Sequence, residues 1–300
     1  MNPPHRLVSL SPNVSMMLFA LGVDAEVVGR TAHCLPAIQH YLKVWGRSEH
    51  DLETRLRHWR GIPVVGVWPL AHAEPIKALQ PDAILTSGSG PFGVHEAEVF
   101  GVAAEAMFHF DTRTFHDLDQ HIRKIGALLD VEAAATALMQ QIAAKRDAII
   151  APRVSRTTPP TVLFEYCVCT TYDADPERRV AEPTRTILVG GHLAPELIRL
   201  SGGEPVLAQP GDTARWVAFD EIHQARPEVV LQYDCHGCPM ARHYPVRTRR
   251  GWDNLPAVER EAVYAVNENI SDPNLCFPAP LEELVGIFNH DARRLDASAD

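Results

Sequence analysis

Residues 74–86 decide the fold, and they read Glu-Pro-Ile-Lys-Ala-Leu-Gln-Pro-Asp-Ala-Ile-Leu-Thr. The first half has the composition of a short helix, Pro81-Asp82 marks a tight turn, and the apolar run that follows predicts a buried strand. Around this stretch, further apolar strands are expected at residues 6–10, 27–29, 64–66 and 106–110. Apolar strands without period-two alternation, separated by helices, indicate a mostly parallel sheet covered on both faces.

A second region of the same kind follows a long helical segment. Residues 115–150 read as nearly uninterrupted helix with one break near Asp130, and residues 132–150 are rich in strong helix formers. Strands are then expected at 161–166, 229–233 and 262–266, and helices at 195–200, 219–225 and 280–295. We therefore expect an α/β fold with two Rossmann-like parallel-sheet lobes, joined by a long backbone helix, with a ligand cleft between them. The expected domains are 1–114, the helical linker 115–152, and 153–300.

Composition narrows the functional classes. A chain of 300 residues suits two domains. The formal charge of −10, from 28 basic and 38 acidic residues, argues against nucleic acid as a partner. No apolar run approaches the length of a membrane span, and no basic or long apolar leader precedes the first strand. We expect a cytoplasmic protein without membrane insertion, or a periplasmic one if a signal peptide was removed.

Five segments across the chain form a specific pattern. They are Arg-Leu-Val-Ser-Leu-Ser-Pro (6–12), Leu-Phe-Ala-Leu-Gly with Val-Val-Gly-Arg-Thr (18–22 and 27–31), residues 74–85, residues 191–203 from Gly-His-Leu-Ala-Pro to Ser-Gly-Gly, and Pro-Glu-Val-Val-Leu (227–231). In this order they resemble the helical-backbone (class III) substrate-binding proteins of cobalamin and iron-chelate ABC importers. The likeness is strongest to a cobalamin-binding-like branch that often lacks a signal peptide. It implies a binding protein that grips a corrinoid, haem or iron chelate, with an ABC permease as a candidate partner.

The resemblance also assigns roles to three residues. His192 opens a helix of the second lobe, where the family directs a histidine at the cleft. Glu74 and Glu221 stand where the family carries the two carboxylates that dock onto arginines of the permease. A glutamate near the start of a helix is also ordinary capping chemistry, so this assignment rests on the resemblance alone.

Other side chains suit a large metal-bearing ligand. Trp68 and Trp216 offer flat apolar walls, although tryptophans also serve as core. Arg242, followed by Arg247, Arg249 and Arg250, can pair with anionic side groups of such a ligand. The alternative is that these arginines form a charged loop exposed to solvent.

The cysteines suggest a metal site. In open parallel sheets ligands bind beyond the carboxyl ends of strands, and five of the six cysteines follow expected strands. Cys235-His236-Gly237-Cys238 has a spacing that lets two thiolates bind one soft metal or an iron–sulfur cluster. The alternative is that buried cysteines act as small apolar side chains. The candidate ligands to iron–sulfur or zinc are Cys34, Cys167, Cys169, Cys235, Cys238 and Cys276, with His33 and His236.

Motifs of common enzymes are absent from the sequence. It contains no dinucleotide-binding glycine pattern, Walker loop, nucleophile elbow or zincin helix. We therefore expect a binding protein, with no catalytic residues assigned. Two alternatives stay open: a cytoplasmic thiolate metal or iron–sulfur protein on the same scaffold, and a chelatase-like or redox enzyme.

Overall fold

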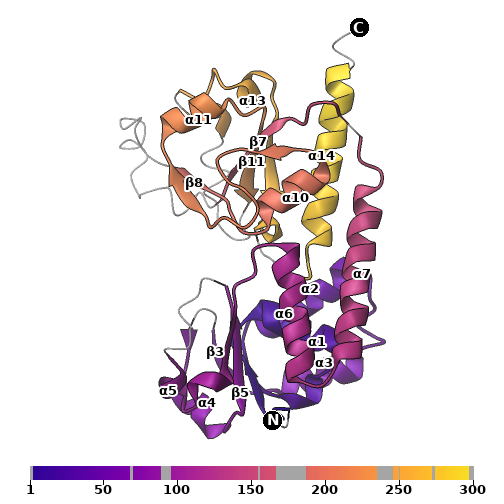
Figure 1. Cartoon of the computed structure of the whole chain (residues 1–300), viewed down its shortest axis with the longest axis vertical. Coiled ribbons are helices and arrows are strands. Elements are labelled where there is room, and N and C mark those ends of the chain that lie inside the picture. Colours follow the sequence, from indigo (N-terminus) through magenta and orange to yellow (C-terminus); the bar gives the residue numbers. More distant parts are fainter. Residues whose placement is uncertain are drawn as a thin grey trace. The chain divides into compact units, whose positions relative to one another are not determined.

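The computed structural model describes residues 3–67, 70–88, 96–154, 156–166, 187–234, 246–249, 251–271 and 274–296. The chain forms two compact units (Figure 1). Unit 1 comprises Met1–Ala144 with Asn274–Cys276, and unit 2 comprises Lys145–Pro273 with Phe277–Asp300. Each unit holds a largely parallel sheet with helices, which confirms the predicted α/β class with two Rossmann-like lobes. No helix within the described ranges is long and apolar enough to cross a membrane.

Unit 1 is built on a six-stranded sheet with the order β4-β3-β2-β1-β5-β6. All neighbouring strands pair in parallel except β3 and β4, which are antiparallel. The sheet strands are β1 (Leu7–Ser9), β2 (Val27–Thr31), β3 (Val64–Val67), β4 (Leu70–Ala71), β5 (Ala83–Ser87) and β6 (Met107–Phe110).

Helices cover the sheet of unit 1 and lead into unit 2. On one face, Val8 and Ile84 pack in a core cluster with Ile76 of α4 and Phe100 of α5. Asp130 has a φ of 56°, a left-handed conformation that ends α6 at the predicted break, and the chain passes into unit 2 within α7. The helices are α1 (Pro12–Leu21), α2 (Cys34–Val44), α3 (Glu53–Gly61), α4 (Ala73–Ala78), α5 (Ala97–Phe100), α6 (Phe115–Leu128) and α7 (Glu132–Ile150), with 3-10 turns η1 (Asp24–Glu26) and η3 (Ala104–Ala106).

Unit 2 has a sheet of the order β10-β8-β7-β11-β12, with β9 paired to β7. The parallel strands are β7 (Thr161–Glu165), β9 (Glu204–Pro205), β11 (Val229–Asp234) and β12 (Val263–Asn267). Strands β8 (Ile187–Val189) and β10 (Arg215–Val217) are antiparallel to their neighbours and are absent from the pattern expected from the sequence. The helices are α10 (Ala194–Ser201), α11 (Phe219–Ala225), α13 (Pro256–Glu259) and α14 (Pro278–Asp296), with η4 (Val246–Thr248) and η5 (Glu268–Ile270).

The two faces of this sheet have separate cores. On one face, Leu163 and Val230 pack with Ile222 of α11 and with Trp252 in the main cluster of unit 2. On the other face, helices α10 and α14 contact each other. We call these the α11 face and the α10 face. Because strand residues alternate between faces, each side chain near the end of a strand belongs to one of them.

Candidate functional site

Two tyrosines lie together where the central strands of unit 2 end. Tyr166 directly follows β7, and Tyr233 lies near the end of β11, with the ring centroids 5.5 Å apart. The ring of Phe164 lies 6.4 Å from that of Tyr166 and 6.2 Å from that of Tyr233, centroid to centroid. Since β7 and β11 are parallel, both tyrosines stand at the carboxyl edge of the sheet. Ligands bind at this edge in open α/β sheets.

The apolar surface that begins at the two tyrosines continues across β8 to β10. The carbonyl of Leu188 accepts a hydrogen bond of 2.9 Å from the backbone N–H of Tyr166. Trp216 is paired in register with Leu188, whereas the adjacent pair, Val217 and Ile187, is buried in the core of the α11 face. Leu188 and Trp216 therefore point to the α10 face, as Tyr166 does.

We call Trp216, Leu188, Tyr166 and Tyr233 the aromatic row, after its three aromatic members; Leu188 is aliphatic. It crosses four neighbouring strands, β10, β8, β7 and β11. At the usual strand spacing it is roughly 14 Å long. Tyr166, Tyr233 and Leu188 are partly buried, and Trp216 is 48% exposed.

Two glycines position His192 beside this row. A Cβ on Gly190 would lie 2.0 Å from Cδ1 of Phe164, and a Cβ on Gly191 would lie 2.2 Å from the carbonyl oxygen of Asp212. Only glycine allows both approaches. The backbone N–H of His192 donates to that same carbonyl at 2.8 Å, and its ring lies 6.1 Å from the ring of Tyr166.

The backbone of His192 adopts an unusual conformation. Its φ of 56° is in the left-handed region, which is costly for a residue with a side chain. Asp130 and Glu261 have the same φ of 56° elsewhere in the chain. The binding roles predicted for His192 and Trp216 stay predictions, but both residues lie at one edge with the two tyrosines.

A buried ion pair occupies the other face at the same edge. Glu165 is fully buried, and its two carboxylate oxygens accept hydrogen bonds of 2.9 and 2.8 Å from Nη1 and Nη2 of Arg249. The guanidinium carbon of Arg249 lies 5.0 Å from the ring centroid of Trp252. The sequence suggests Arg249 as a partner for an anionic ligand, but in the structure Glu165 neutralises it. Arg247 instead donates to the carbonyl of Glu261 at 3.0 Å.

Cys34 is buried in unit 1, at the first turn of α2. Its side chain is 0% exposed and lies 3.1 Å from the hydroxyl oxygen of Thr31. Burial raises the pKa of the Cys34 thiol, and hydrogen bonds from Ser15 and Thr31 offset this only in part. The raised pKa favours the neutral thiol at this position, and the predicted role of Cys34 as a metal ligand stays a prediction.

Cys276 is also buried, in the short segment of unit 1 that precedes α14. Its sulfur lies 3.6 Å from the thioether of Met16, and its backbone N–H donates to Asn274 at 2.7 Å. Among the described residues, no group of three or more His, Cys, Asp or Glu is placed to hold a metal ion. His33 is exposed, although it adjoins Cys34.

Several predicted site residues lie outside the described residues, so the predicted cysteine and histidine site stays a prediction. They are Trp68, Cys167, Cys169, Cys235, His236, Cys238 and Arg242.

The two glutamates assigned to permease docking differ in their surroundings. Glu74, in the first turn of α4, is 86% exposed in its side chain and pairs with Lys77 at 3.1 Å. Glu221, in the first turn of α11, accepts from the backbone N–H of Ala218 at 2.8 Å and from Arg215 at 3.1 Å. These two interactions lower the pKa of Glu221 below its ordinary value. Glu74 is thus the more available carboxylate.

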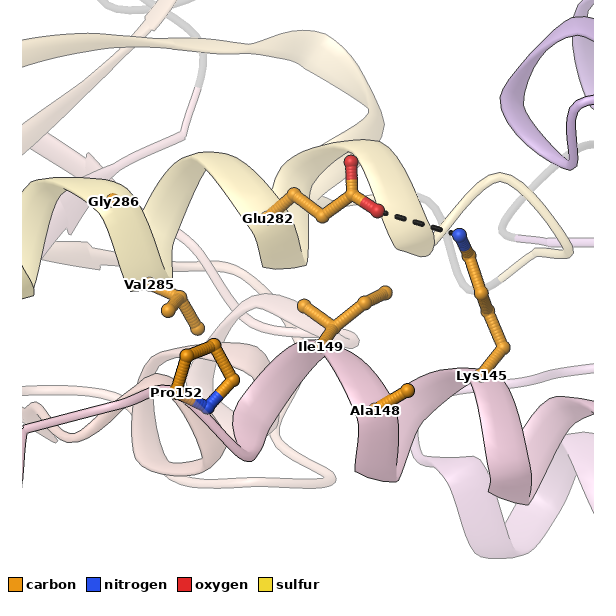
Figure 2. A pocket seen from close by; sticks show the side chains of 7 residues that line it. All are labelled: Lys145, Ala148, Ile149, Pro152, Glu282, Val285 and Gly286. Carbon is orange, nitrogen blue, oxygen red and sulfur yellow. Dashed lines mark ion pairs between the residues drawn. The ribbon is translucent and has the colours of Figure 1, made fainter.

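A groove in unit 2 separates the C-terminal part of α7 from α14. It has a volume of about 410 Å³. Figure 2 shows Ile149 and Pro152 on one side and Val285 on the other, with Lys145 and Glu282 paired at 3.4 Å. Because the two charged groups satisfy each other, the groove presents mainly apolar surface. It is lined by Lys145, Ala148, Ile149, Pro152, Glu282, Val285 and Gly286.

Comparisons with known proteins place this geometry in context. The family model described as periplasmic binding protein matches residues 7–269. Among solved structures, the chain is similar to the periplasmic heme-binding protein BhuT in complex with two hemes, with a TM-score of 0.64 and 21% identity over 95% of this chain and 98% of that one. A search of curated protein sequences found no match.

Two further solved structures show the same fold. The periplasmic vitamin B12 binding protein BtuF of Vibrio cholerae gives a TM-score of 0.63 with 18% identity, over 98% of this chain and 100% of that one. IsdE of S. aureus, complexed with heme, gives 0.65 with 15% identity, over 94% and 98% respectively.

Proposed function

The chain belongs to the periplasmic binding protein family, and on that premise we propose that it binds a metal-containing ligand against the aromatic row of unit 2. The ligand classes are a corrinoid, a haem or an iron chelate, since similar solved structures are named for heme and vitamin B12. The observation that carries the proposal is the pairing of Tyr166 with Tyr233, beside His192, at the carboxyl edge of the sheet.

The chemistry of the row suits such a ligand. Aromatic rings provide a broad apolar contact for a flat macrocycle, while tyrosine hydroxyls and the imidazole supply a few polar contacts that fix orientation. Among the described residues at this edge, Arg249 on the α11 face is bound to Glu165.

Membership in a family of binding proteins supports a binding role over catalysis. We propose that the protein serves an ABC importer outside the cytoplasm, as the periplasmic relatives suggest, with Glu74 and Glu221 as its docking carboxylates. The cytoplasmic location expected from the sequence has no support in the comparisons. The iron–sulfur and enzyme alternatives gain none either.

Titration tests the proposal. Haemin, cyanocobalamin and a ferric hydroxamate are each added to the purified protein, and the absorbance spectrum and tryptophan fluorescence are followed. We expect at least one probe to give a saturable change, and we expect Tyr166→Ala and Tyr233→Ala each to weaken that binding by about tenfold. Tyr166→Phe keeps the ring and should keep most of the affinity. Phe108→Ala, in unit 1, is the control for loss of an aromatic side chain.

The absence of saturable binding for all three probes would refute the proposed function. Binding that both tyrosine-to-alanine variants retain unchanged would place the ligand away from the aromatic row.

A further inference from the structure

We propose that the groove between α7 and α14 is a second binding site, which takes the alkyl chain of a zwitterionic amphiphile. None of its lining residues belongs to the aromatic row, so the inference does not depend on the proposed function. Ligand pockets commonly have volumes of about 300–1,000 Å³, and the groove, at about 410 Å³, falls in that range. In Figure 2 the side chains of Ile149 and Val285 extend into it from facing helices.

The interior of the groove is apolar and reaches the backbone of α14. Ile149 and Val285 form its floor, with exposures of 8% and 5%. A Cβ added at Gly286 would meet no atom within 4 Å. Glycine inside a helix is unfavourable for folding, and at this position it leaves open space between the two helices. An apolar space of this kind binds apolar groups in preference to water.

Polar groups lie at both ends of the groove. At one end, Nζ of Lys145 lies 3.4 Å from a carboxylate oxygen of Glu282. At the other end, the side-chain amide of Asn289 accepts from the backbone N–H of Val154 at 2.8 Å and donates to the carbonyl of Pro152 at 3.2 Å. From Lys145 to Pro152 the groove runs about 10 Å at the rise of an α-helix. This length suits a short alkyl chain that lies between the helices.

The ion pair defines the polar head of the ligand. The side chains of Lys145 and Glu282 are 33% and 56% exposed, so a ligand reaches both. Surface ion pairs of this kind are weak. A head with a single charge would bind one partner and leave the other without its counter-ion. A zwitterionic head places its anionic group at Lys145 and its cationic group at Glu282, so that every charge stays compensated.

The depth of the floor favours a single amphiphile molecule over a membrane surface. Ile149 and Val285 are buried, whereas Ala148, Pro152 and Gly286 around them are exposed. A flat bilayer surface contacts the exposed rim, but an individual alkyl chain also covers the recessed floor. The occupant is therefore one chain of an amphiphile that carries, for example, a phosphate and an ammonium group.

A set of octyl amphiphiles separates the chain from the head. Octylphosphocholine, octanoate, octylammonium and octyl glucoside share the chain and differ in the charge of the head. Each is titrated into the purified protein below its micellar concentration, and binding is measured by isothermal titration calorimetry. We expect octylphosphocholine to bind saturably at one site, roughly tenfold more tightly than each of the other three probes.

Variants of the groove test both parts of the site. Gly286→Leu fills the open space and should weaken octylphosphocholine binding by more than about tenfold. Gly61→Leu is the matched control, because Gly61 ends α3 in unit 1 and a Cβ added there also meets no atom within 4 Å. Glu282→Gln leaves Lys145 without its counter-ion and should shift the preference to octanoate. Lys145→Gln should shift it to octylammonium.

Four outcomes would overturn the inference. The first is the absence of saturable octylphosphocholine binding, and the second is equal affinity for all four probes. The third is binding that Gly286→Leu leaves unchanged while circular dichroism shows the variant folded. The fourth is flotation of the protein with phosphatidylcholine vesicles without binding of the monomeric probe, which would assign the contact to a membrane surface. In each case the proposed function stands, because haemin, cyanocobalamin and ferric hydroxamate test it separately.

Discussion

Breaking the ion pair between Glu165 and Arg249 should strongly destabilise unit 2. The substitution Arg249→Met keeps the length and apolar contact of the side chain over Trp252 but removes its charge. It leaves the carboxylate of Glu165, which is 0% exposed, without its two donors at 2.8 and 2.9 Å. An uncompensated buried charge of this kind costs about 3–5 kcal/mol.

That cost is a large fraction of the stability of one domain, which is about 5–15 kcal/mol. Because Arg249 is only 11% exposed in its side chain, solvent screening reduces the effect little. We expect the unfolding temperature of unit 2 to fall by about 10 °C. The double variant Glu165→Leu with Arg249→Met removes both charges and should recover most of the loss, because apolar replacement of a buried pair is often nearly neutral.

Thermal unfolding by circular dichroism, with hydrogen exchange resolved to β7 and β11, measures the effect. Exchange is needed because a chain of two units need not unfold in one step. In Arg249→Met the amides of β7 and β11 should exchange faster, and those of β1 and β5 in unit 1 should not change. If the free energy of unfolding of Arg249→Met lies within about 1 kcal/mol of that of the unmodified protein, the pair is not buried as described.

Three further predictions concern other elements. Burial lowers the pKa of His121, so the folded state binds this proton more weakly than the unfolded chain does. The free energy of unfolding should therefore fall as the pH drops from 7 through about 6.5. A pH series of unfolding temperatures should show a smaller fall in the His121→Gln variant. Gly286→Ala should stabilise the protein by about 0.5–1 kcal/mol, because a Cβ added at Gly286 meets no atom within 4 Å. Gly126→Ala should destabilise the protein, because a Cβ added at Gly126 would lie 2.6 Å from the Cβ of Ala135. Urea unfolding compares the two variants. Cys34, whose thiol has a pKa raised by burial, should react with a disulfide reagent only after denaturant is added, and rapid labelling in the native state would contradict its placement.

Local signals predict most of the fold. The helix 219–225 and the helix 132–150 are found with the expected bounds, and Asp130 breaks the helical segment as expected. Helix formers, glycines and apolar runs within these segments indicate both the type of each element and where it begins and ends. By contrast α3 was not predicted, because only Leu56 and Trp59 of its nine residues are buried.

The position of α3 depends on contacts that no local pattern reveals. The carboxylate of Asp24, about thirty residues earlier, accepts hydrogen bonds from Arg55 at 2.5 Å and from the indole of Trp59 at 2.6 Å. Strands β8 and β10 were missed for a related reason. They have three residues each, and their antiparallel pairing joins segments far apart in the sequence. Such short strands are defined by their partners rather than by their own sequence.

A position after the end of a strand does not by itself make a residue accessible to a ligand. Ligands lie beyond strand carboxyl ends, and the cysteines are not the first residues there. The strands expected at 161–166 and 229–233 both end in tyrosine, so Tyr166 and Tyr233 stand closer to the strand ends than the cysteines that follow them. Cys34 satisfies the same rule after β2, but it begins α2 and returns into the core at 0% exposure. Cys34 starts the next helix and is buried by it, whereas Tyr166 and Tyr233 stand at the ends of their strands and stay only partly buried at the edge of the sheet.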